Sequence, residues 1–329
     1  MMEEMISVVV ITYNQETTIS RTLDSILMQK CHLPIEIVIG EDCSQDHTRH
    51  ICQTYATRYP DVIRLFCNQY NKGIVDNYFD CLLQCRGRYI ADCAGDDFWI
   101  DPEKLEKEVR VMEKNKNVTM VITNWQYYDE RSHKTTPSRQ RHHAPITPGR
   151  KLLKAMITQQ YMSVFHLCTS LYRSDVFRKA YEEDIDLFRH KAYVSEDMQI
   201  AFTMAQHGDI AYLPDITLNY SCEGVSNTID DIKLFDFVHK TTLQIQYMAS
   251  KTNIDIQDFL VDRIFVLGMH AFRSHQQELF QKTQKYKEEW HVPETRKITW
   301  LFFVMQHDWL WRLGLILRRC VVNAKQLCP

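Results

Sequence analysis

The stretch "RYIADCAGDDFWIDPEKLEKEV" (residues 88–109) joins a strand pattern to a helix pattern and decides the fold. Its first six residues, mostly apolar and β-prone, predict a strand that ends just before Asp96 and Asp97. Asp101 is a good N-cap and Pro102 fits the first helical position, so a helix is predicted from there. Because Asp101 takes the capping role, local structure leaves Asp96 and Asp97 unexplained.

The same alternation of strand and helix runs through the preceding residues. Continuous apolar runs predict buried strands at 6–11, 35–42 and 62–66, and helical spacing of apolar residues links them. Ser44 is the expected cap of the second helix. Such repetition predicts right-handed βαβ units and an α/β fold with a mostly parallel, doubly wound, Rossmann-like sheet.

Three polar motifs follow predicted strands: "TYN" (12–14), "EDCSQD" (41–46) and "GDD" (95–97). Ligands of parallel α/β sheets bind beyond the carboxyl ends of the strands, so the motifs predict a site at that edge. Two adjacent carboxylates there suit a divalent ion such as Mg²⁺ or Mn²⁺ together with a sugar hydroxyl or a metal-bound water. An ordinary structural role for the pair remains the alternative.

Bulk composition narrows the function classes. The 329 residues carry a formal net charge of −3, so no basic field favours nucleic acid as a partner. The 11 cysteines include no C-x-x-C pair, the spacing that is typical of zinc sites and of thioredoxin-like redox proteins. The sequence therefore gives no support to either of these two classes. The acidic N-terminus has no basic segment before its short apolar run, so we expect a reducing, cytoplasmic location.

The second half is less regular. Strands are expected at 118–123 and 165–173. Residues 131–151 are predicted to form a loop, which is either an ordinary exposed loop or a mobile flap over the substrate. Residues 193–215 predict an acidic loop, a helix and an edge strand. In that loop "SED" (195–197) either starts the helix, with Ser195 as its cap, or supplies a carboxylate to a site.

From about residue 226 the pattern is helical, and residues 298–325 form a strongly apolar segment interrupted by charged residues. No run reaches the ~18–20 apolar residues that span a bilayer. Its tryptophans and arginines suit a peripheral helix lying on a membrane surface. The alternative is a helix packed on the protein's own core.

The ordered motifs "VVVITYNQETTISRTLDSILMQ", "EIVIGEDCSQDHT" and "NKGIVDNYFDCLLQCRGRYIADCAGDDFWIDPEKLEKEV" resemble the family 2 glycosyltransferases with the GT-A fold. The resemblance covers residues 6–112 almost continuously and returns at 168–177 and 195–208. It implies a GT-A domain over residues 1–225, followed by a C-terminal helical region at 226–329 that lies outside it.

The resemblance implies an enzyme that moves a sugar from a nucleotide diphosphate donor, most often a UDP-sugar, to an acceptor hydroxyl with inversion. It also implies a divalent cofactor, Mn²⁺ or Mg²⁺, and a carbohydrate or lipid-linked acceptor. Surface polysaccharide, lipopolysaccharide or capsule assembly at the inner face of the cytoplasmic membrane is the expected setting. Neither the donor sugar nor the oligomeric state follows from it.

The family's site residues can be carried over to matching positions. Asp42, preceded by Glu41, matches the acid that binds the nucleobase. Other positions matching the nucleotide pocket are Thr12, Tyr13, Asn14, Asn71 and Gly73. Asp96 is expected to bind ribose and Asp97 the metal, although these two roles are exchangeable. Asp197 matches the general base, with Glu196 beside it.

Some positions depart from the family pattern. Ala94 stands where many members carry a further acid, and "YSCE" (220–223) replaces a motif with arginine and histidine, so no helper for the diphosphate is identified. A catalytically silent nucleotide-sugar-binding protein therefore stays open as an alternative. A nucleotidyltransferase or a dinucleotide oxidoreductase is disfavoured, because "VVVITYNQETT" lacks a glycine-rich loop.

Overall fold

The computed structural model describes residues 2–138, 144–158, 166–222 and 230–326, without the side chains of 318–326. The chain forms two compact units, Met1–Asn227 and Thr228–Pro329, and each is described by itself. The boundary predicted at 225/226 lies outside the described residues. The strands of the first unit are β1 (Glu3–Thr12), β2 (Ile35–Glu41), β3 (Ile63–Cys67), β4 (Gly87–Asp92), β5 (Phe98–Trp99), β6 (Val118–Tyr128), β7 (Thr135–Pro137), β8 (Ile146–Pro148), β9 (Ser170–Arg173) and β10 (Asp209–Ser221).

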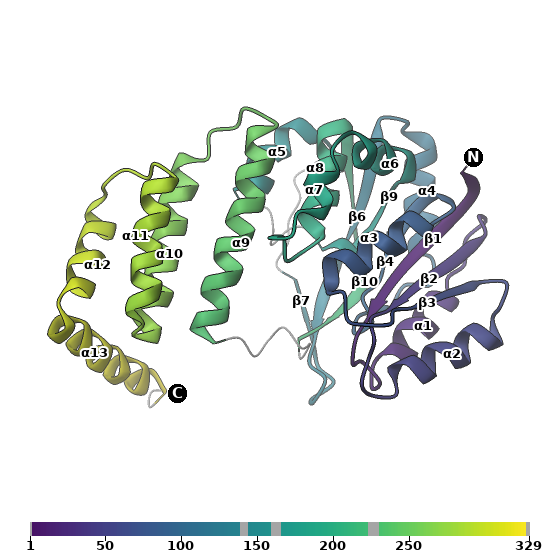
Figure 1. The fold of residues 1–329 in the computed structure, drawn as a ribbon. Helices are drawn as coiled ribbons and strands as arrows, with labels where there is room; N and C mark the ends of the chain where they lie inside the picture. The colour runs from purple at the N-terminus through teal and green to yellow at the C-terminus, as the bar shows by residue number, and fades with distance from the viewer. Residues whose placement is uncertain (1, 139–143, 159–165, 223–229, 327–329) are drawn as a thin grey trace. The chain divides into compact units, whose positions relative to one another are not determined.

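One sheet runs through the first unit in the order β3-β2-β1-β4-β9-β6-β10-β5 (Figure 1). β3, β2, β1 and β4 pair in parallel, as predicted, and the chain leaves β1 to one side for β2 and to the other for β4. β9 then pairs antiparallel with both β4 and β6. The predicted α/β fold is confirmed, but its second half is mixed because β9 runs against its neighbours.

Helices cover both faces of this sheet. The helices are α1 (Ile19–Leu27), α2 (Thr48–Arg58), α3 (Ile74–Gln84), α4 (Lys104–Lys114), α5 (Gly149–Ile157), α6 (Ser174–Glu183), α7 (Ile185–Arg189) and α8 (Asp197–His207). Apolar residues of α1, α2 and α4 share one core with inward residues of β1 and β2. Ring contacts join Phe79 of α3 to Phe177 of α6 and Phe188 of α7 in a second apolar layer.

Several local predictions need correction. α2 begins at Thr48 rather than after Ser44, and Asp46 Oδ1 accepts the Thr48 N–H at 2.9 Å. α4 begins at Lys104, because the Asp101 carboxylate accepts the Glu103 N–H at 2.9 Å and closes a turn before the helix. At α8 the N-cap position belongs to Glu196, not to Ser195.

Two further corrections concern the second half of this unit. The stretch expected to be a loop at 131–151 contains β7, β8 and the start of α5. β10, expected at an edge, instead pairs with β6 along one side and with β5 and β8 along the other. Three-residue strands carry too little periodicity to be read from sequence.

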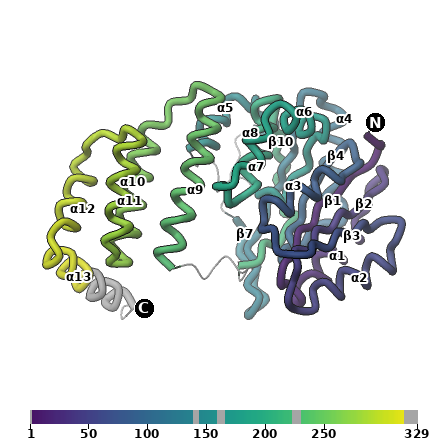
Figure 2. Tube along the Cα trace, viewed as in Figure 1, coloured from purple at the N-terminus to yellow at the C-terminus, as the bar shows by residue number. Residues whose placement is uncertain are grey.

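The second unit consists of α9 (Asp231–Ser250), α10 (Gln257–Ser274), α11 (Gln277–Glu289), α12 (Arg296–Gln306) and α13 (Asp308–Gln326), which Figure 2 traces from green to yellow. Its apolar core includes Ile264, Leu267 and Ile298. The apolar segment 298–325 forms two helices, not one, because His307 is extended between them. In the described part of the chain, no helix combines the length and apolarity needed to cross a bilayer.

Candidate functional site

A cavity of about 450 Å³ opens at the carboxyl edge of β1, β2 and β4. Six residues predicted to bind the nucleotide line it: Thr12, Tyr13, Asp42, Asn71, Gly73 and Asp96. Ile11, Gln15, Ile74, Asn77 and Ala94 complete the lining. The cavity therefore lies where the strand order changes direction, which is the position that parallel α/β sheets use for ligands.

Asp42 organises one wall of this cavity. Its Oδ1 accepts hydrogen bonds from Asn68 Nδ2 at 2.8 Å and from the Lys72 N–H at 2.9 Å. Its Oδ2 accepts the Gly73 N–H at 2.9 Å, and Gly73 adopts a positive φ of 83°. One carboxylate thus fixes the loop that lines the cavity, and Oδ2 retains a lone pair for a further N–H donor.

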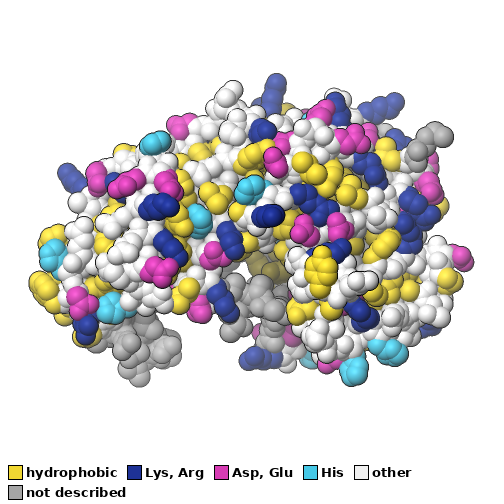
Figure 3. Space-filling view, in the orientation of Figure 1, with side chains coloured by type: hydrophobic (Ala, Val, Ile, Leu, Met, Phe, Trp, Pro, Cys, Tyr) yellow, Lys and Arg dark blue, Asp and Glu magenta, His cyan; other side chains and the backbone are white. Residues whose placement is uncertain are grey.

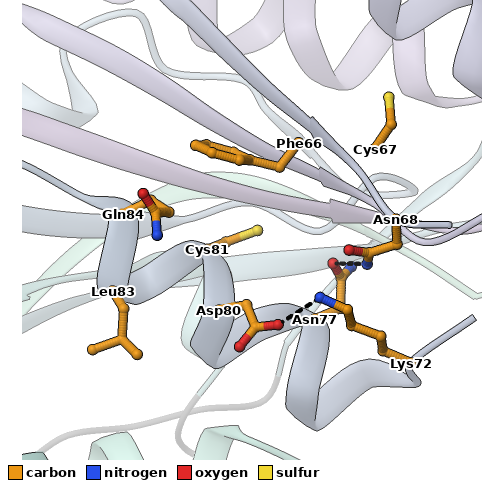
Figure 4. A pocket seen from close by; sticks show the side chains of 9 residues that line it. All are labelled: Phe66, Cys67, Asn68, Lys72, Asn77, Asp80, Cys81, Leu83 and Gln84. Carbon is orange, nitrogen blue, oxygen red and sulfur yellow. Dashed lines mark hydrogen bonds and ion pairs between the residues drawn. The ribbon is translucent and has the colours of Figure 1, made fainter. Parts of the chain in front are cut away.

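A second, smaller cavity of about 320 Å³ lies beside the first and shares Asn77 with it (Figure 4). In this view Lys72 reaches Asp80, with a Nζ–Oδ2 distance of 2.8 Å, and Asn68 contacts Asn77. Asp80 does not line the larger cavity. The Lys72 loop is therefore tied from two sides, by Asp42 through its backbone and by Asp80 through its side chain.

Hydrogen bonds from α1 and its N-cap residue fix the backbone of the "GDD" turn. Thr18 Oγ1 donates to the carbonyl of Gly95 at 2.8 Å, and Thr22 Oγ1 donates to that of Asp97 at 2.6 Å. A Cβ at Gly95 would lie 2.3 Å from Gln15 Oε1 and 3.0 Å from Thr12 Cβ, so a larger residue would force both side chains to shift. The turn is consequently a rigid part of the sheet edge.

The two adjacent aspartates of this turn point to different surroundings. Asp96 lines the cavity, whereas Asp97 is 1% exposed and its Oδ1 accepts the Ser221 N–H at 3.0 Å. Burial raises the pKa of both carboxyls, and for Asp97 the neighbouring Asp96 charge raises it further. Both are expected at the metal, with the ribose and metal roles exchangeable between them, and this stays a prediction; among the described residues, the cluster of potential metal ligands that contains Asp97 does not include Asp96.

His166 and Cys168 complete that cluster. The three ligand atoms of Asp97, His166 and Cys168 all lie within 4.8 Å of one another. His166 Nε2 lies 3.9 Å from Asp97 Oδ2, and burial lowers the pKa of His166 to about 4, so its ring is neutral at pH 7. A carboxylate, a neutral imidazole and a thiol are a donor set that fits a divalent cation.

Glu196, which is 9% exposed, and the half-buried Asp197 form an acidic pair at the start of α8. Burial raises the pKa of both, and that of Glu196 rises furthest because the Asp197 charge adds to the effect of burial. A hydrogen bond from protonated Glu196 to Asp197 keeps the latter the more acidic of the two. Asp197 is close enough to raise the pKa of Asp97 as well.

Two predicted nucleotide-binding residues do not line the cavity. Glu41 is fully buried, and its carboxylate accepts the Ser44 N–H and the Arg49 Nε–H. Asn14 donates its N–H to Ser44 Oγ at 3.0 Å and accepts from the Gln45 N–H. Both side chains hold the loop after β2 and neither lines the cavity, so their predicted nucleotide-binding role stays a prediction.

Sequence reasoning also missed residues that the structure brings to the site. Gln15 and Asn77 line the cavity, and each lies one turn or less from a predicted motif, so a wider reading of "TYNQ" and "NKGIVDN" would have included them. His166 and Cys168 had no comparable signal. They reach Asp97 only because β9 pairs with β4, a contact across about 80 residues of chain.

Comparison with known proteins gives a consistent result. The model of the family described as "Glycosyl transferase family 2" matches residues 7–180. An uncharacterised protein of Mycobacterium tuberculosis, Rv1520, is 41% identical over 114 residues, which are 35% of this chain and 33% of that protein. The Escherichia coli protein WfgD, named a UDP-Glc:alpha-D-GlcNAc-diphosphoundecaprenol beta-1,3-glucosyltransferase, is 31% identical over 128 residues, 39% of this chain and 48% of its own.

The chain spans less than half the length of the curated relatives it matches. Among solved structures, residues 1–349 of TarS from S. aureus, crystallised with UDP-GlcNAc, superpose with a TM-score of 0.56. That match covers 94% of this chain and 92% of the other at 15% identity, so it bears on the fold alone. The fold it supports is the GT-A arrangement.

Proposed function

Because the chain belongs to glycosyltransferase family 2, we propose that it transfers a sugar from a nucleoside diphosphate donor to an acceptor hydroxyl, with inversion at the anomeric carbon. One observation carries this proposal. A cavity lined by Asp42 and Asp96 lies at the sheet edge beside the buried Asp97, and Asp197, paired with Glu196, is close enough to Asp97 to raise its pKa. That arrangement offers a nucleotide pocket next to groups able to move a proton.

In this proposal the cavity holds the nucleoside. Asp42 accepts an N–H of the base through the lone pair that its Oδ2 retains, and Tyr13, 37% exposed at the rim, packs against the ring. Asp96 accepts the ribose hydroxyls. WfgD is named as a UDP-glucose enzyme, which supports UDP as the nucleotide.

Asp197 acts as the base in this proposal. It takes the proton from the acceptor hydroxyl as that oxygen attacks the anomeric carbon, while protonated Glu196 hydrogen-bonds to Asp197 and favours its anionic form. A divalent cation held at Asp97 would neutralise the charge that develops on the diphosphate leaving group. A single displacement with one base and no covalent nucleophile inverts the anomeric centre.

The test is a panel of nucleotide sugars incubated with the protein, with and without Mn²⁺, followed by donor hydrolysis and transfer. We expect metal-dependent turnover that Asp197→Asn abolishes without loss of UDP binding. Asp186→Asn is the matched control, because Asp186 is an exposed acid in the first turn of α7 and loses the same charge at a helix start. UDP-sugar binding without turnover on any acceptor, unchanged in Asp197→Asn, would instead identify a silent binding protein.

We further propose that α12 and α13 bring the enzyme to an anionic membrane surface at which a lipid-linked acceptor of surface polysaccharide synthesis resides. Six large apolar side chains on these helices are between 45 and 68% exposed: Trp300, Phe303, Trp309, Leu313, Ile316 and Leu317. Figure 3 shows hydrophobic side chains along the margin where Figure 1 draws α12. Other side chains of the same helices, such as Trp311 and Leu301, are buried, so among the side chains that the structure describes the exposed set lies outside the core of its unit.

Charge complements this apolar surface. Residues 296–329 contain six lysines and arginines but a single acid, Asp308, in a chain whose overall charge is −3. Basic residues beside exposed tryptophans are typical of helices that lie in a lipid interface. The name of WfgD specifies a diphosphoundecaprenol-linked acceptor, which supports a lipid-linked acceptor for this enzyme too.

Vesicle sedimentation tests the membrane proposal. The protein should sediment with phosphatidylglycerol-containing vesicles and less with phosphatidylcholine alone, since part of the attraction is electrostatic. The triple variant Trp309→Ser, Leu313→Ser, Ile316→Ser should remain in the supernatant. The control pair Ile232→Ser, Phe237→Ser removes exposed apolar side chains from α9 and should sediment like the parent. A parent protein that ignores anionic vesicles would refute the proposal.

A further inference from the structure

The cluster of Asp97, His166 and Cys168 carries an inference about the cation itself. A 3₁₀ turn at Leu167–Thr169 places His166 and Cys168 on the same side of the Asp97 carboxylate. The turn is held internally, because the His166 carbonyl accepts both the N–H and the Oγ1–H of Thr169, at 2.9 and 2.7 Å. Trp99 Nε1 donates to the Cys168 carbonyl at 2.9 Å and fixes the turn to the sheet.

Cys168 lies beside Ala94, the position at which the family resemblance leads one to expect a further acid. The backbone N–H of Ala94 donates to Cys168 Sγ at 3.2 Å, and the Cys168 thiol also hydrogen-bonds to the Asp97 carboxylate. Ala94 has no side-chain oxygen to offer a cation. The thiol occupies that neighbourhood in its place, 6% exposed and facing a carboxylate that is itself buried.

His166 completes the group from the other side. Its ring packs edge-on against Tyr220, with ring centres 4.6 Å apart, and lies 5.8 Å from the Trp125 ring. These aromatic contacts direct Nε2 towards Asp97 Oδ2, 3.9 Å away. Asp97 Oδ1 is occupied by the Ser221 N–H, so Oδ2 is the oxygen that faces both His166 and the cluster.

We propose that Asp97, His166 and Cys168 hold the divalent cation together, and that the imidazole and the thiolate make this site select a borderline transition-metal ion, such as Co²⁺ or Zn²⁺, over Mg²⁺. Mg²⁺ prefers oxygen ligands in near-ideal octahedral geometry, whereas imidazole and thiolate favour transition metals. Three protein ligands leave further coordination positions open to the diphosphate of a donor. Only this last role rests on the proposed function.

Binding changes the protons on two ligands. The thiol proton of Cys168 leaves to solvent, and the sulfur donates an electron pair to the ion. In the ion-free chain the Cys168 N–H donates to His166 Nδ1 at 3.3 Å, so the ring proton is on Nε2. The ring proton moves to Nδ1 when the ion takes Nε2, and this long hydrogen bond is given up.

Cobalt spectroscopy tests the proposal without any assay of turnover. Co²⁺ is titrated into the full-length, metal-free protein, and absorbance is followed in the near ultraviolet, where a thiolate-to-cobalt charge-transfer band appears, and in the visible region. We expect the near-ultraviolet band in the parent protein. Cys168→Ser should lose it and weaken Co²⁺ binding on the order of tenfold or more, since even outer-shell changes cost about 10–100-fold.

The chain offers a matched control. Cys31, His32 and Glu106 form a second group with metal-ligand geometry, but they lie nearer the surface and His32 already contacts Glu106 and Glu113. Cys31→Ser should leave the cobalt band unchanged. A band lost in Cys31→Ser and kept in Cys168→Ser would assign the ion to the surface group and overturn the proposal.

Competition tests the selectivity. A large excess of Mg²⁺ should leave the cobalt band in place, while Zn²⁺ should abolish it by displacement. His166→Asn should weaken Co²⁺ binding and keep the near-ultraviolet band at saturation, because the thiolate remains. Thermal midpoints of the ion-free variants report whether each one folds.

The two proposals fail in different ways. A cobalt band that depends on Cys168, in a protein that turns over no nucleotide sugar, would leave the metal site standing and refute the transferase. Metal-dependent turnover with Mn²⁺ affinity unchanged in Cys168→Ser and His166→Asn would support the transferase and refute the ligand set. Displacement of Co²⁺ by Mg²⁺ at equal concentration would refute the selectivity.

Discussion

Removing the charge of Asp42 should weaken nucleotide binding selectively. In Asp42→Asn the carboxylate that accepts the Asn68 Nδ2–H and the Lys72 and Gly73 N–H groups becomes an amide with one acceptor oxygen. Whichever way the amide turns, its NH₂ group faces a donor. At least one charge-assisted hydrogen bond is lost, and the loop at Asn71–Gly73, which lines the cavity, loosens.

The size of the effect follows from these contacts. Hydrogen bonds to charged groups are worth about 1.5–3 kcal/mol, so losing the one that Asp42 is proposed to accept from the nucleobase N–H predicts roughly a 10–100-fold weaker Kd for UDP. The loosened loop at Asn71–Gly73 adds to this value. Isothermal titration calorimetry with UDP measures it directly, without an acceptor and without turnover.

Asp80→Asn is the control for this experiment. Asp80 lines the neighbouring cavity, accepts from Lys72 Nζ at 2.8 Å, and carries the same charge as Asp42 (Figure 4). If the weaker UDP binding came merely from losing a negative charge near Lys72, both variants would bind UDP with the same affinity. We expect Asp80→Asn to stay within about threefold of the parent, because surface ion pairs contribute little. A folded Asp42→Asn variant with parental UDP affinity would refute the reasoning.

Two further predictions concern the buried charges of the same unit. Lys104 and Glu108 are both fully buried, with a Nζ–Oε2 distance of 2.8 Å. Lys104→Met leaves Glu108 buried without its partner, so it should lower the free energy of unfolding, measured by chemical denaturation, by about 3–5 kcal/mol. The double variant Lys104→Met, Glu108→Leu should recover most of that loss. Burial raises the pKa of Asp92 to about 8, well above its value in the unfolded chain. The stability that protonated Asp92 provides is therefore lost as the pH rises from about 4 to 8. Asp92→Asn, which still accepts the Tyr78 O–H, should raise the melting temperature at pH 8 more than at pH 5, and an equal gain at both would contradict this.

The first half of the fold was predictable because its strands are buried on both faces. β1 is an almost unbroken apolar run, and the helix spacing between strands leaves βαβ units as the natural arrangement. The same rule predicts that Thr12, Asp42 and Asp96 meet at one edge, and all three line the cavity there. Continuous apolar runs and chain connectivity are local properties, so the sequence carries them directly.

The rest depended on contacts that no local pattern encodes. His166 and Cys168 approach Asp97 through the antiparallel pairing of β9 with β4, and neither residue lies in a periodic stretch. Glu41 looked like part of an acidic binding motif, but its burial against Arg49 turned it into a structural residue. Chemistry-bearing residue types can be recognised in a sequence, whereas the direction of each side chain is decided by its packing.

The "GDD" turn places two adjacent carboxylates in different environments. Thr18, the N-cap residue of α1, and Thr22 within α1 donate hydrogen bonds to the carbonyls of Gly95 and Asp97, so the turn is tied to the helix. In the turn that follows β4, Asp96 lines the cavity, whereas Asp97 contacts Ser221 and approaches His166. A nucleoside on Asp96 and a cation on Asp97 would therefore lie at a fixed separation, set by a single peptide unit. Because the spacing is built into rigid backbone, the diphosphate between them would be positioned before any acceptor arrives, which is the preorganisation that a displacement at the anomeric carbon requires.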